Sequence, residues 1–403
     1  MSFKNKKKIL IVEPFHTGHH ISLYLRNLLV EFEKQNISIN ILTSLRAYQS
    51  EVFKEIEKDI DIENIFLLKE IAEPKNQTYL SIFFYEIKWW LIIKKEFLRI
   101  NKLHKFEKIY LTSVDFIHNA LAIFGNPFKK TSFSTLFVSP KHHFADESHN
   151  KRRFSKLRDS LFSRILNQKN LSKIYVIDIN FYEFLQKKKI ENNHKIEYVP
   201  DFGSLNISIN KQNARKNIGL SNSDFVILVY GSISSRKGLL QLVESAIKHS
   251  FDRQVKIIIA GKIEKKLFEI YKNNTPKFFR ENNVVERFFF HSEFQEGEVF
   301  SASDCVWLGY SKGHIGSSGV LYQSAIGNLP SISTNHGLIG RIVSENKMGI
   351  LINPDNPEEI NSAINKLSED KVLFKTFKKN CETFSKNNNL QVHVSKITKS
   401  LLN

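Results

Sequence analysis

The strongest constraint on the fold is a repeated alternation of short apolar runs with longer amphipathic stretches. Near the N-terminus, the apolar run 8–12 is followed by a loop at 13–20, a helical pattern at 21–34 and a second apolar run at 37–42. Short runs that are apolar throughout are typical of strands covered on both faces, and a helix between two of them makes a parallel βαβ unit. The sequence therefore predicts an α/β fold with doubly wound parallel sheets.

The same alternation continues along the first half of the chain and restarts in the second half. Further strand candidates are 108–112, 134–138, 174–177, 196–199, 225–230, 255–260, 288–291, 305–308 and 331–333. Residues 199–204 are predicted to be a loop between the two series, and residues 357–403 to be helical. We expect two Rossmann-like domains, 1–200 and 201–380, that face each other across a cleft. Residues 381–403 are expected to form a helix that packs back on the first domain.

The composition excludes several other classes of protein. The chain has 403 residues, of which 41% are hydrophobic and 25% charged, so it can bury more than one core and is not disordered. Two cysteines are too few for a disulfide scaffold or a cysteine-based zinc cluster. The most apolar window, 79–93, is shorter than the roughly 18 residues of a spanning helix, and run 8–12 is too short for a signal peptide. We expect a cytoplasmic protein without a transmembrane segment.

The first of two informative loops follows the predicted strand 225–230. Gly231 permits a sharp turn off that strand, and Arg236 and Lys237 stand just before an apolar-periodic helix. Ser234 and Ser235 are candidate N-caps of that helix. Cations beside a helix N-terminus favour a diphosphate ligand. The alternative interpretation is a solvated loop with an exposed basic pair.

The second informative loop, 309–319, lies between the predicted strand 305–308 and another helix. It contains four glycines and three serines in eleven residues, a composition typical of a nest of backbone N–H groups that binds anions. Both loops are predicted at the carboxyl ends of strands, where ligands of such sheets bind. Neither loop fits the P-loop or the dinucleotide fingerprint, which argues against an ATPase and an NAD enzyme.

At these loops the sequence resembles the GT-B-fold glycosyltransferases, specifically the retaining family 4, most closely over 225–353. The glycine after a strand and the Lys-Gly pair six residues on are matched by Gly231 and by Lys237 with Gly238. The family's arginine position holds Ser232, and Arg236 is expected to supply that charge. Further matches are Ser303-Asp304, Gly327-Asn328-Leu329-Pro330 and the strand-like Met348-Gly349-Ile350-Leu351-Ile352.

One departure from the family pattern concerns two glutamates that lie eight positions apart around the glycine turn. The first contacts the transferred sugar in the family and falls here on His314 or Ile315; the second contacts the ribose and falls on Gln323. Glutamine can still hydrogen-bond a ribose hydroxyl, and His314 can donate to a sugar hydroxyl or a phosphate.

The resemblance also implies which residues form the site. The expected donor-binding residues are Gly18, Gly231, Ser232, Ser311, His314, Gly316, Ser317, Ser318, Gly319 and Gln323. His142 and His143 follow the predicted strand 134–138, where the family often places a histidine near the transferred sugar. His19 and His20 are either acceptor-side contacts or exposed loop residues. Arg236 and Lys237 would stabilise the leaving diphosphate, so no metal or other cofactor is expected.

The charge of the chain leans toward its first half. The net charge is +18, and residues 1–200 carry 33 Lys and Arg against 22 Asp and Glu. The predicted helix near 151–164 has six cations opposed only by Asp159: Lys151, Arg152, Arg153, Lys156, Arg158 and Arg164. It is either a docking element for anionic lipid, together with the region of Trp89 and Trp90, or a core-facing helix with a solvated basic face. No nucleic-acid-binding module is recognisable, and no nucleic-acid partner is expected.

These observations lead to one main functional hypothesis. We expect a glycosyltransferase that moves a sugar from a nucleotide-diphosphate sugar to a glycan or lipid-linked acceptor in cell-surface polysaccharide synthesis, with retention. Two alternatives stay open. One is a nucleotide-sugar 2-epimerase, which shares the fold but needs carboxylates in the cleft. The other is a non-catalytic glycan- or nucleotide-binding protein with a degenerate site, which the absent glutamates favour.

Overall fold

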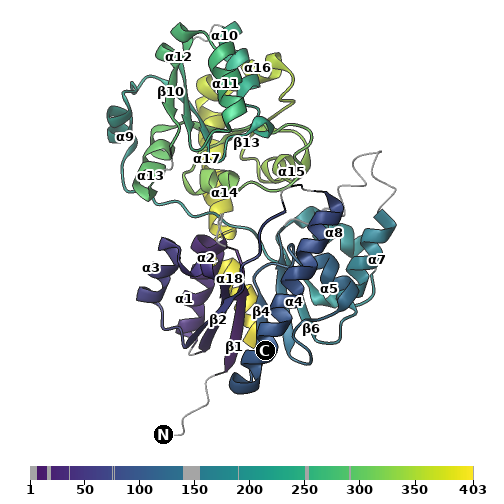
Figure 1. Ribbon diagram of the computed structural model, residues 1–403. Coiled ribbons are helices and arrows are strands. Elements are labelled where there is room, and N and C mark those ends of the chain that lie inside the picture. The colour runs from purple at the N-terminus through teal and green to yellow at the C-terminus, as the bar shows by residue number, and fades with distance from the viewer. Residues whose placement is uncertain are drawn as a thin grey trace. The chain divides into compact units, whose positions relative to one another are not determined.

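The computed structural model describes residues 7–15, 20–35, 37–74, 76, 78–138, 155–188, 190–249, 254–289 and 292–402. It divides into two compact units, shown in Figure 1. Unit 1 comprises Met1–Pro200 with Leu390–Asn403, and unit 2 comprises Asp201–Asn389. Each unit is built on its own parallel sheet, so the predicted α/β class with two doubly wound sheets is confirmed.

Unit 1 contains a seven-stranded parallel sheet in the order β3-β2-β1-β4-β5-β6-β7. Its strands are β1 (Lys8–Glu13), β2 (Ser38–Ser44), β3 (Asn64–Leu68), β4 (Lys108–Leu111), β5 (Ser132–Phe137), β6 (Leu171–Val176) and β7 (Ile196–Tyr198). Along β1, Ile9 and Ile11 pack into one buried cluster, and Leu10 and Val12 pack into another. The two clusters lie on opposite faces because successive side chains of a strand alternate. This is why residues 9–12 of β1 are all apolar.

Helices cover both faces of the unit 1 sheet. They are the π-helical turn η1 (His20–Leu25), α1 (Arg26–Lys34), α2 (Leu45–Tyr48), α3 (Glu51–Asp59), α4 (Tyr79–His104), α5 (His118–Phe124), α7 (Ser155–Leu166), α8 (Ile179–Lys187) and the 3₁₀ turn η3 (Asn193–Lys195). The C-terminal helix α18 (Leu390–Leu402) lies beside α1 and adds Val394, Ile397 and Leu401 to that face (Figure 1). Residues 381–387 belong instead to the preceding helix in unit 2.

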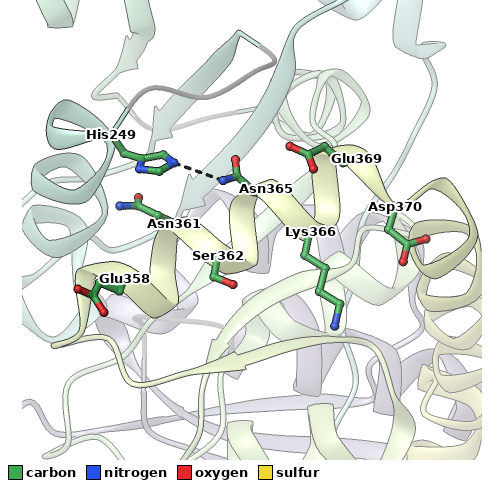
Figure 2. A pocket seen from close by; sticks show the side chains of 8 residues that line it. All are labelled: His249, Glu358, Asn361, Ser362, Asn365, Lys366, Glu369 and Asp370. Atoms are coloured by element: carbon green, nitrogen blue, oxygen red, sulfur yellow. Dashed lines mark hydrogen bonds between the residues drawn. The ribbon is translucent and has the colours of Figure 1, made fainter.

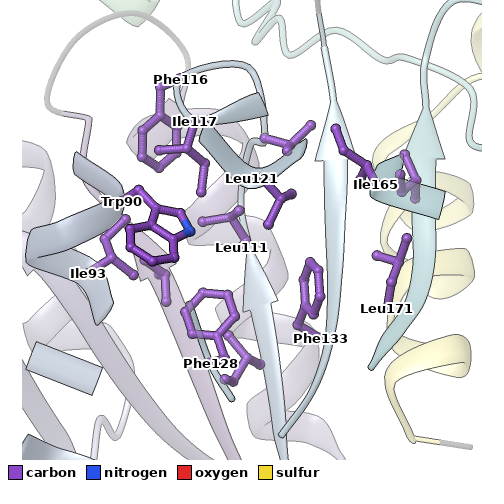
Figure 3. Packing of buried hydrophobic residues seen from close by; sticks show 14 of the residues in the cluster. Trp90, Ile93, Leu111, Phe116, Ile117, Leu121, Phe128, Phe133, Ile165 and Leu171 are labelled. Carbon is purple, nitrogen blue, oxygen red and sulfur yellow. The ribbon is translucent and has the colours of Figure 1, made fainter. Parts of the chain in front are cut away.

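The aromatic segment of α4 is part of the core of unit 1. Trp89 and Trp90 are only 4% and 5% exposed. Figure 3 shows Trp90 among Leu111, Ile117 and Leu121, and its indole nitrogen donates to the carbonyl oxygen of Gly125 at 2.8 Å. A role of these two tryptophans as surface anchors is therefore wrong, because their rings are enclosed by the sheet and by α5.

Unit 2 contains a six-stranded parallel sheet in the order β10-β9-β8-β11-β12-β13. Its strands are β8 (Phe225–Tyr230), β9 (Val255–Ala260), β10 (Val284–Arg287), β11 (Cys305–Leu308), β12 (Ser331–Thr334) and β13 (Gly349–Ile352). The strand predicted at 288–291 is misplaced, because the residues that pair with β9 are 284–287. The charges of Glu286 and Arg287 are accommodated in this edge strand by ion pairs with Lys272 and Glu298.

The helices of unit 2 include one that is held by a buried arginine. They are α9 (Lys211–Ile218), the 3₁₀ turn η4 (Ser235–Lys237), α10 (Leu239–Lys248), α11 (Lys265–Asn274), α12 (Lys277–Asn283), α13 (Glu293–Ala302), α14 (Gly319–Ile326), α15 (Gly337–Asn346), α16 (Pro357–Glu369) and α17 (Lys371–Asn387). Arg215 of α9 donates to three backbone carbonyls of 221–224, to the carbonyl of Ala302 and to Asp304 at 2.7 Å. Asp304 also accepts the N–H of Val226, so this pair ties α9 to the centre of the sheet. Within the described part of the chain, no helix combines the length and apolar character needed to cross a membrane.

Candidate functional site

The two informative loops lie side by side at the carboxyl edge of the unit 2 sheet. They follow β8 and β11, which are neighbours in the sheet. The backbone N–H of Ser311 donates to the carbonyl of Arg236, and the indole of Trp307 donates to the carbonyl of Lys237, both at 2.9 Å. A Cβ on Gly238 would stand 2.1 Å from the carbonyl oxygen of Gly309, so only glycine permits this approach.

The predicted serine caps are wrong. Ser234 and Ser235 enter the 3₁₀ turn η4, which ends at Gly238 in the left-handed region with φ of 65°. Helix α10 begins after this glycine and has no side-chain cap. The chain therefore passes through this 3₁₀ turn before α10 begins, and the turn places Arg236 and Lys237 beside the second loop.

Lys237 is a buried cation at the centre of this edge. Its side chain is 6% exposed, and Nζ donates to the carbonyl oxygen of Tyr230. The Nζ atom lies 5.9 Å from the ring centroid of Tyr310. Among the described residues no carboxylate forms an ion pair with it. Burial, followed by the charge of Arg236, lowers the pKa of Lys237 to about 7. An anionic ligand would supply the missing counter-charge.

Arg236 is exposed and forms a stack with two rings of the second loop. Its guanidinium lies 5.5 Å from the ring centroid of Tyr310, and Nη1 is 3.3 Å from Nδ1 of His314. The rings of Tyr310 and His314 are stacked at 4.3 Å. Burial and then Arg236 lower the pKa of His314 to about 4, so the ring is neutral at pH 7. The Nε2 atom of this ring is buried without a hydrogen-bond partner in the described part of the chain.

The glycine loop leaves open space in front of its backbone. A Cβ built on Gly313, Gly316 or Gly319 would meet nothing within 4 Å. Ser318 precedes α14 but does not cap it, because its hydroxyl is bonded to the hydroxyl of Tyr310 at 2.8 Å. Ser317 is bonded to Asp201 at 3.4 Å. The loop therefore presents backbone rather than serine hydroxyls to that space.

The remaining predicted residues of unit 2 occupy different surroundings. Ser232 is exposed, and the carbonyl of Ser311 lies 3.2 Å from a ring nitrogen of His336. Gln323 is 9% exposed, and its amide nitrogen is 2.7 Å from Oε1 of Glu296 on α13. The sequence analysis did not predict His336 or Glu296 as residues of the site. His336 comes three residues after the predicted strand 331–333, which is a usable signal, whereas Glu296 reaches the site only through helix packing.

Most of the predicted residues of unit 1 lie outside the described residues. These are Gly18, His19, His142 and His143. His20 begins the π-helical turn η1, but its side chain is not among those described.

Unit 1 nevertheless has polar groups at its own carboxyl edge that the sequence analysis did not single out. Glu13, the last residue of β1, is fully buried and accepts the N–H of Phe15 at 2.9 Å. Burial raises the pKa of its carboxyl to about 7. His118 lies at the start of α5, with Nδ1 3.0 Å from the carbonyl of Asp115. Glu86 of α4 accepts the backbone N–H of Asn119 at 2.8 Å.

A separate hollow of about 600 Å³ lies along α16, and Figure 2 shows its lining. The residues that line it are His249, Glu358, Asn361, Ser362, Asn365, Lys366, Glu369 and Asp370. None of these residues was predicted to bind the donor. Among the described residues, no group of three His, Cys, Asp or Glu side chains is placed to hold a metal ion.

Comparison with known proteins finds a family match in the second half of the chain. Residues 210–389 match the family model of glycosyl transferases group 1. Over this range the chain is similar to the group 1 glycosyltransferases. This match covers nearly all of unit 2, including both loops, and it confirms the resemblance and the expected class of enzyme, a glycosyltransferase. No curated protein sequence matches the chain.

Solved structures similar to this chain extend the comparison to both units. HepE from Anabaena, in complex with UDP, superimposes with a TM-score of 0.68 at 15% identity, over 98% of this chain and 99% of that one. WaaG, a glycosyltransferase involved in lipopolysaccharide biosynthesis, gives 0.64 at 13% identity, over 98% and 99%. A UDP-N-acetylglucosamine 2-epimerase gives 0.63 at 11% identity, over 98% and 95%. At this identity the likeness establishes the fold, and the expected GT-B fold is confirmed.

Proposed function

We propose that this group 1 domain transfers a sugar from a nucleotide-diphosphate sugar and that Arg236 and Lys237 hold the diphosphate. The observation that carries the proposal is the pair of cations at the carboxyl edge of β8 and β11. One cation is buried without a carboxylate partner among the described residues, and both face a glycine loop with open space before it. The structure of HepE with UDP supports a nucleotide as the ligand of this fold.

The chemistry follows from charge stabilisation. When the bond from the anomeric carbon to the diphosphate oxygen breaks, negative charge develops on the diphosphate, and Lys237 and Arg236 stabilise it. The acceptor oxygen forms the new bond to that carbon, and its proton passes to the leaving diphosphate. This route needs no protein base on the acceptor side and leads to retention. The neutral His314 has one ring N–H, which can donate to a phosphate or a sugar hydroxyl.

We assign the acceptor to the class of glycans or lipid-linked glycans of the cell surface. WaaG, which shares the fold, acts in lipopolysaccharide biosynthesis, and this supports the assignment. His142 and His143 remain the proposed residues near the transferred sugar, with Gly18, His19 and His20 on the loop after β1. The transfer is proposed to need no metal or other cofactor.

We also propose that the protein binds the surface of an anionic membrane from the cytoplasmic side. The outer face of α4 carries Leu80, Phe84 and Leu91, which are 70%, 59% and 53% exposed. Lys88 and Lys95 are exposed at intervals that place them on this same face of the helix. We name these five residues the α4 face. Apolar side chains interleaved with cations match the boundary between headgroups and acyl chains.

The basic helix α7 is a second candidate for membrane contact. Leu157 is 56% exposed and Arg164 is also exposed. Residues 151–154 lie outside the described residues, as does the side chain of Lys156. On α7 the cluster is opposed by Asp159, which is paired with Lys188 at 2.5 Å. We therefore propose the α4 face, rather than α7, as the main membrane contact. Trp89 and Trp90 lie on the same helix but are buried in the core.

The experiment is incubation of the purified protein with UDP- and GDP-sugars, with glycan and lipid-linked acceptors, followed by detection of free UDP or GDP and of the product. Release of nucleoside diphosphate that depends on an acceptor supports the transferase. Conversion of UDP-N-acetylglucosamine to its 2-epimer would favour the second candidate, which the 2-epimerase structure supports. Nucleotide binding without turnover would favour a binding protein, in line with Gln323 and His314 at the family's glutamate positions.

A further inference from the structure

The side chain of Gln323 is held in one orientation by its neighbours in unit 2. Its Nε2 donates to Oε1 of Glu296 at 2.7 Å and to the carbonyl oxygen of Ser204 at 3.2 Å. Both neighbours are acceptors, so the amide nitrogen must face them. The hydroxyl of Tyr230, at the end of β8, is hydrogen-bonded to Glu296 as well.

With this orientation, the amide of Gln323 can only accept a hydrogen bond from a ligand. A side-chain amide has two N–H donors and one carbonyl acceptor. Glu296 and Ser204 use both donors, and Oε1 has no partner among the described residues. A free glutamine can present either end to a ligand, whereas this one presents only its oxygen. A carboxylate at the same position would likewise present only acceptors.

We propose that Glu296 is a positioning residue that makes Gln323 an obligate acceptor for a ribose hydroxyl. The inference rests on the proposed function, because it assumes that a nucleoside diphosphate occupies the edge formed by β8 and β11. The family has a glutamate at the position of Gln323 on α14. Here the negative charge is instead on Glu296 of α13, which is hydrogen-bonded to Gln323. A short charge-assisted hydrogen bond of 2.7 Å also polarises the amide and strengthens its oxygen as an acceptor.

The proposal predicts that restoring the family's glutamate alone is harmful. Gln323→Glu would place a second carboxylate at hydrogen-bond distance from Glu296, where two like charges cannot both be ionised at low cost. The exchange of the pair, Glu296→Gln with Gln323→Glu, removes the repulsion between the two carboxylates, although the new carboxylate still faces the carbonyl oxygen of Ser204 without a donor. The new amide at 296 accepts from Tyr230 and donates to the new carboxylate at 323, which again presents an acceptor.

The test is calorimetric titration with UDP and GDP and with their 2′-deoxy and 3′-deoxy counterparts. The unaltered protein should prefer at least one ribonucleotide over its deoxy form by about tenfold, the value of one hydrogen bond to a ligand. Glu296→Ala should abolish this ratio while the affinity for the deoxy form stays the same. Gln323→Glu should weaken ribonucleotide binding. The exchanged pair should recover part of the affinity and of the ratio, with the carbonyl of Ser204 left without its donor.

Glu293→Ala is the matched control, because it removes an exposed carboxylate from the first turn of the same helix α13. It should keep the ratio. A ratio that survives Glu296→Ala, or an exchanged pair no better than Gln323→Glu alone, overturns the role of Glu296 and leaves the proposed function standing. If the unaltered protein binds none of these nucleotides, the proposed function fails, and this inference fails with it. Thermal melting of each variant shows whether it is folded. Loss of folded protein lowers the apparent binding of both ligands equally, so it does not change the ratio of the affinities for the ribonucleotide and its deoxy form.

Discussion

Each unit has a buried ionisable group at or after the carboxyl end of its first strand, but the two groups have opposite charge types. In unit 2, Lys237 lies in the loop after β8, and burial lowers its pKa to about 7. In unit 1, Glu13 is the last residue of β1, and burial raises its pKa to about 7. Both edges keep a charge out of water, which costs free energy unless a ligand or a partner compensates. At the edge of unit 2 a bound anion would compensate the buried ammonium, whereas at the edge of unit 1 the carboxyl keeps its proton below about pH 7.

The largest expected effect is on the free energy of unfolding of unit 2, and it distinguishes Arg215, which supports the fold, from Arg236, which belongs to the proposed site. Arg215→Ala removes the buried guanidinium from Asp304 and from four backbone carbonyls, and among the described residues it leaves Asp304 only the half-exposed Lys211 as an ion-pair partner. This substitution should lower the free energy of unfolding of unit 2 by about 3–5 kcal/mol. Arg236→Ala, at an exposed position, should change it little. Chemical denaturation of both variants compares the two arginines. Equal stability losses would show that the carboxyl edge, and not only the α9 anchor, supports the fold.

The opposite charge types predict opposite pH dependence of stability. Between 4.5 and about 7, folded Glu13 keeps a proton that the unfolded chain has released, so the free energy of unfolding falls as the pH rises. Between about 7 and 10.5, the unfolded chain keeps a proton that folded Lys237 has lost, so it rises with pH. Each slope is at most about 1.4 kcal/mol per pH unit. We expect Glu13→Gln to remove the fall in the free energy of unfolding between pH 4.5 and about 7 and to leave the rise above pH 7 unchanged. Chemical denaturation at a series of pH values measures both. An unchanged fall in this variant would contradict burial of the carboxyl.

The affinity for a nucleoside diphosphate should also depend on pH through Lys237. The charged form binds the anion, and above about pH 7 the free protein must take up a proton to form it. Affinity should therefore fall as the pH rises past neutrality, by at most about tenfold per pH unit. Lys237→Arg should remove this dependence, because a guanidinium stays charged. Titration calorimetry in buffers of different ionisation enthalpy measures the proton uptake directly, and no uptake above neutral pH would refute the role of the lysine.

The smallest effect concerns the α4 face. Lys88→Glu with Lys95→Glu should weaken sedimentation with anionic vesicles, since each cation near such a surface contributes about 1 kcal/mol. Lys265→Glu with Lys266→Glu on α11 of unit 2 makes the same charge change at exposed positions and should have no effect. Added salt should weaken the binding of the unaltered protein. Equal loss in both double variants would point to net charge rather than to this face.

The elements that the sequence predicted well are those whose pattern is set locally. β8 and β9 are central strands, apolar on both faces, and they begin and end where the apolar runs do. β3 is an edge strand with half-buried residues, which explains why no clear pattern marked it. The aromatic residues at 288–290 look more like a strand than Val284–Arg287 does. The charged residues of β10 are tolerated only through ion pairs from α11 and α13.

The site shows the same division. Arg236, Lys237 and the glycine loop were predictable because strand-loop-helix order places them at one edge. Glu296 was not, because 27 positions separate it from Gln323 and only the packing of α13 against the sheet brings the two together. The low pKa of His314 and the stack with Tyr310 also depend on distances that no spacing in the sequence encodes.

The central claim is that Arg236 and Lys237 hold a diphosphate, and titration of UDP and GDP at neutral pH tests it most directly. Lys237→Ala and Arg236→Ala should each weaken binding of the preferred nucleotide by about 1.5–3 kcal/mol, the value of a charge-assisted contact. Lys312→Ala removes an exposed cation from the neighbouring loop, where it faces Asp355 at 3.8 Å, and should leave the affinity unchanged. Unchanged affinity in both the Lys237 and the Arg236 variants would contradict the claim.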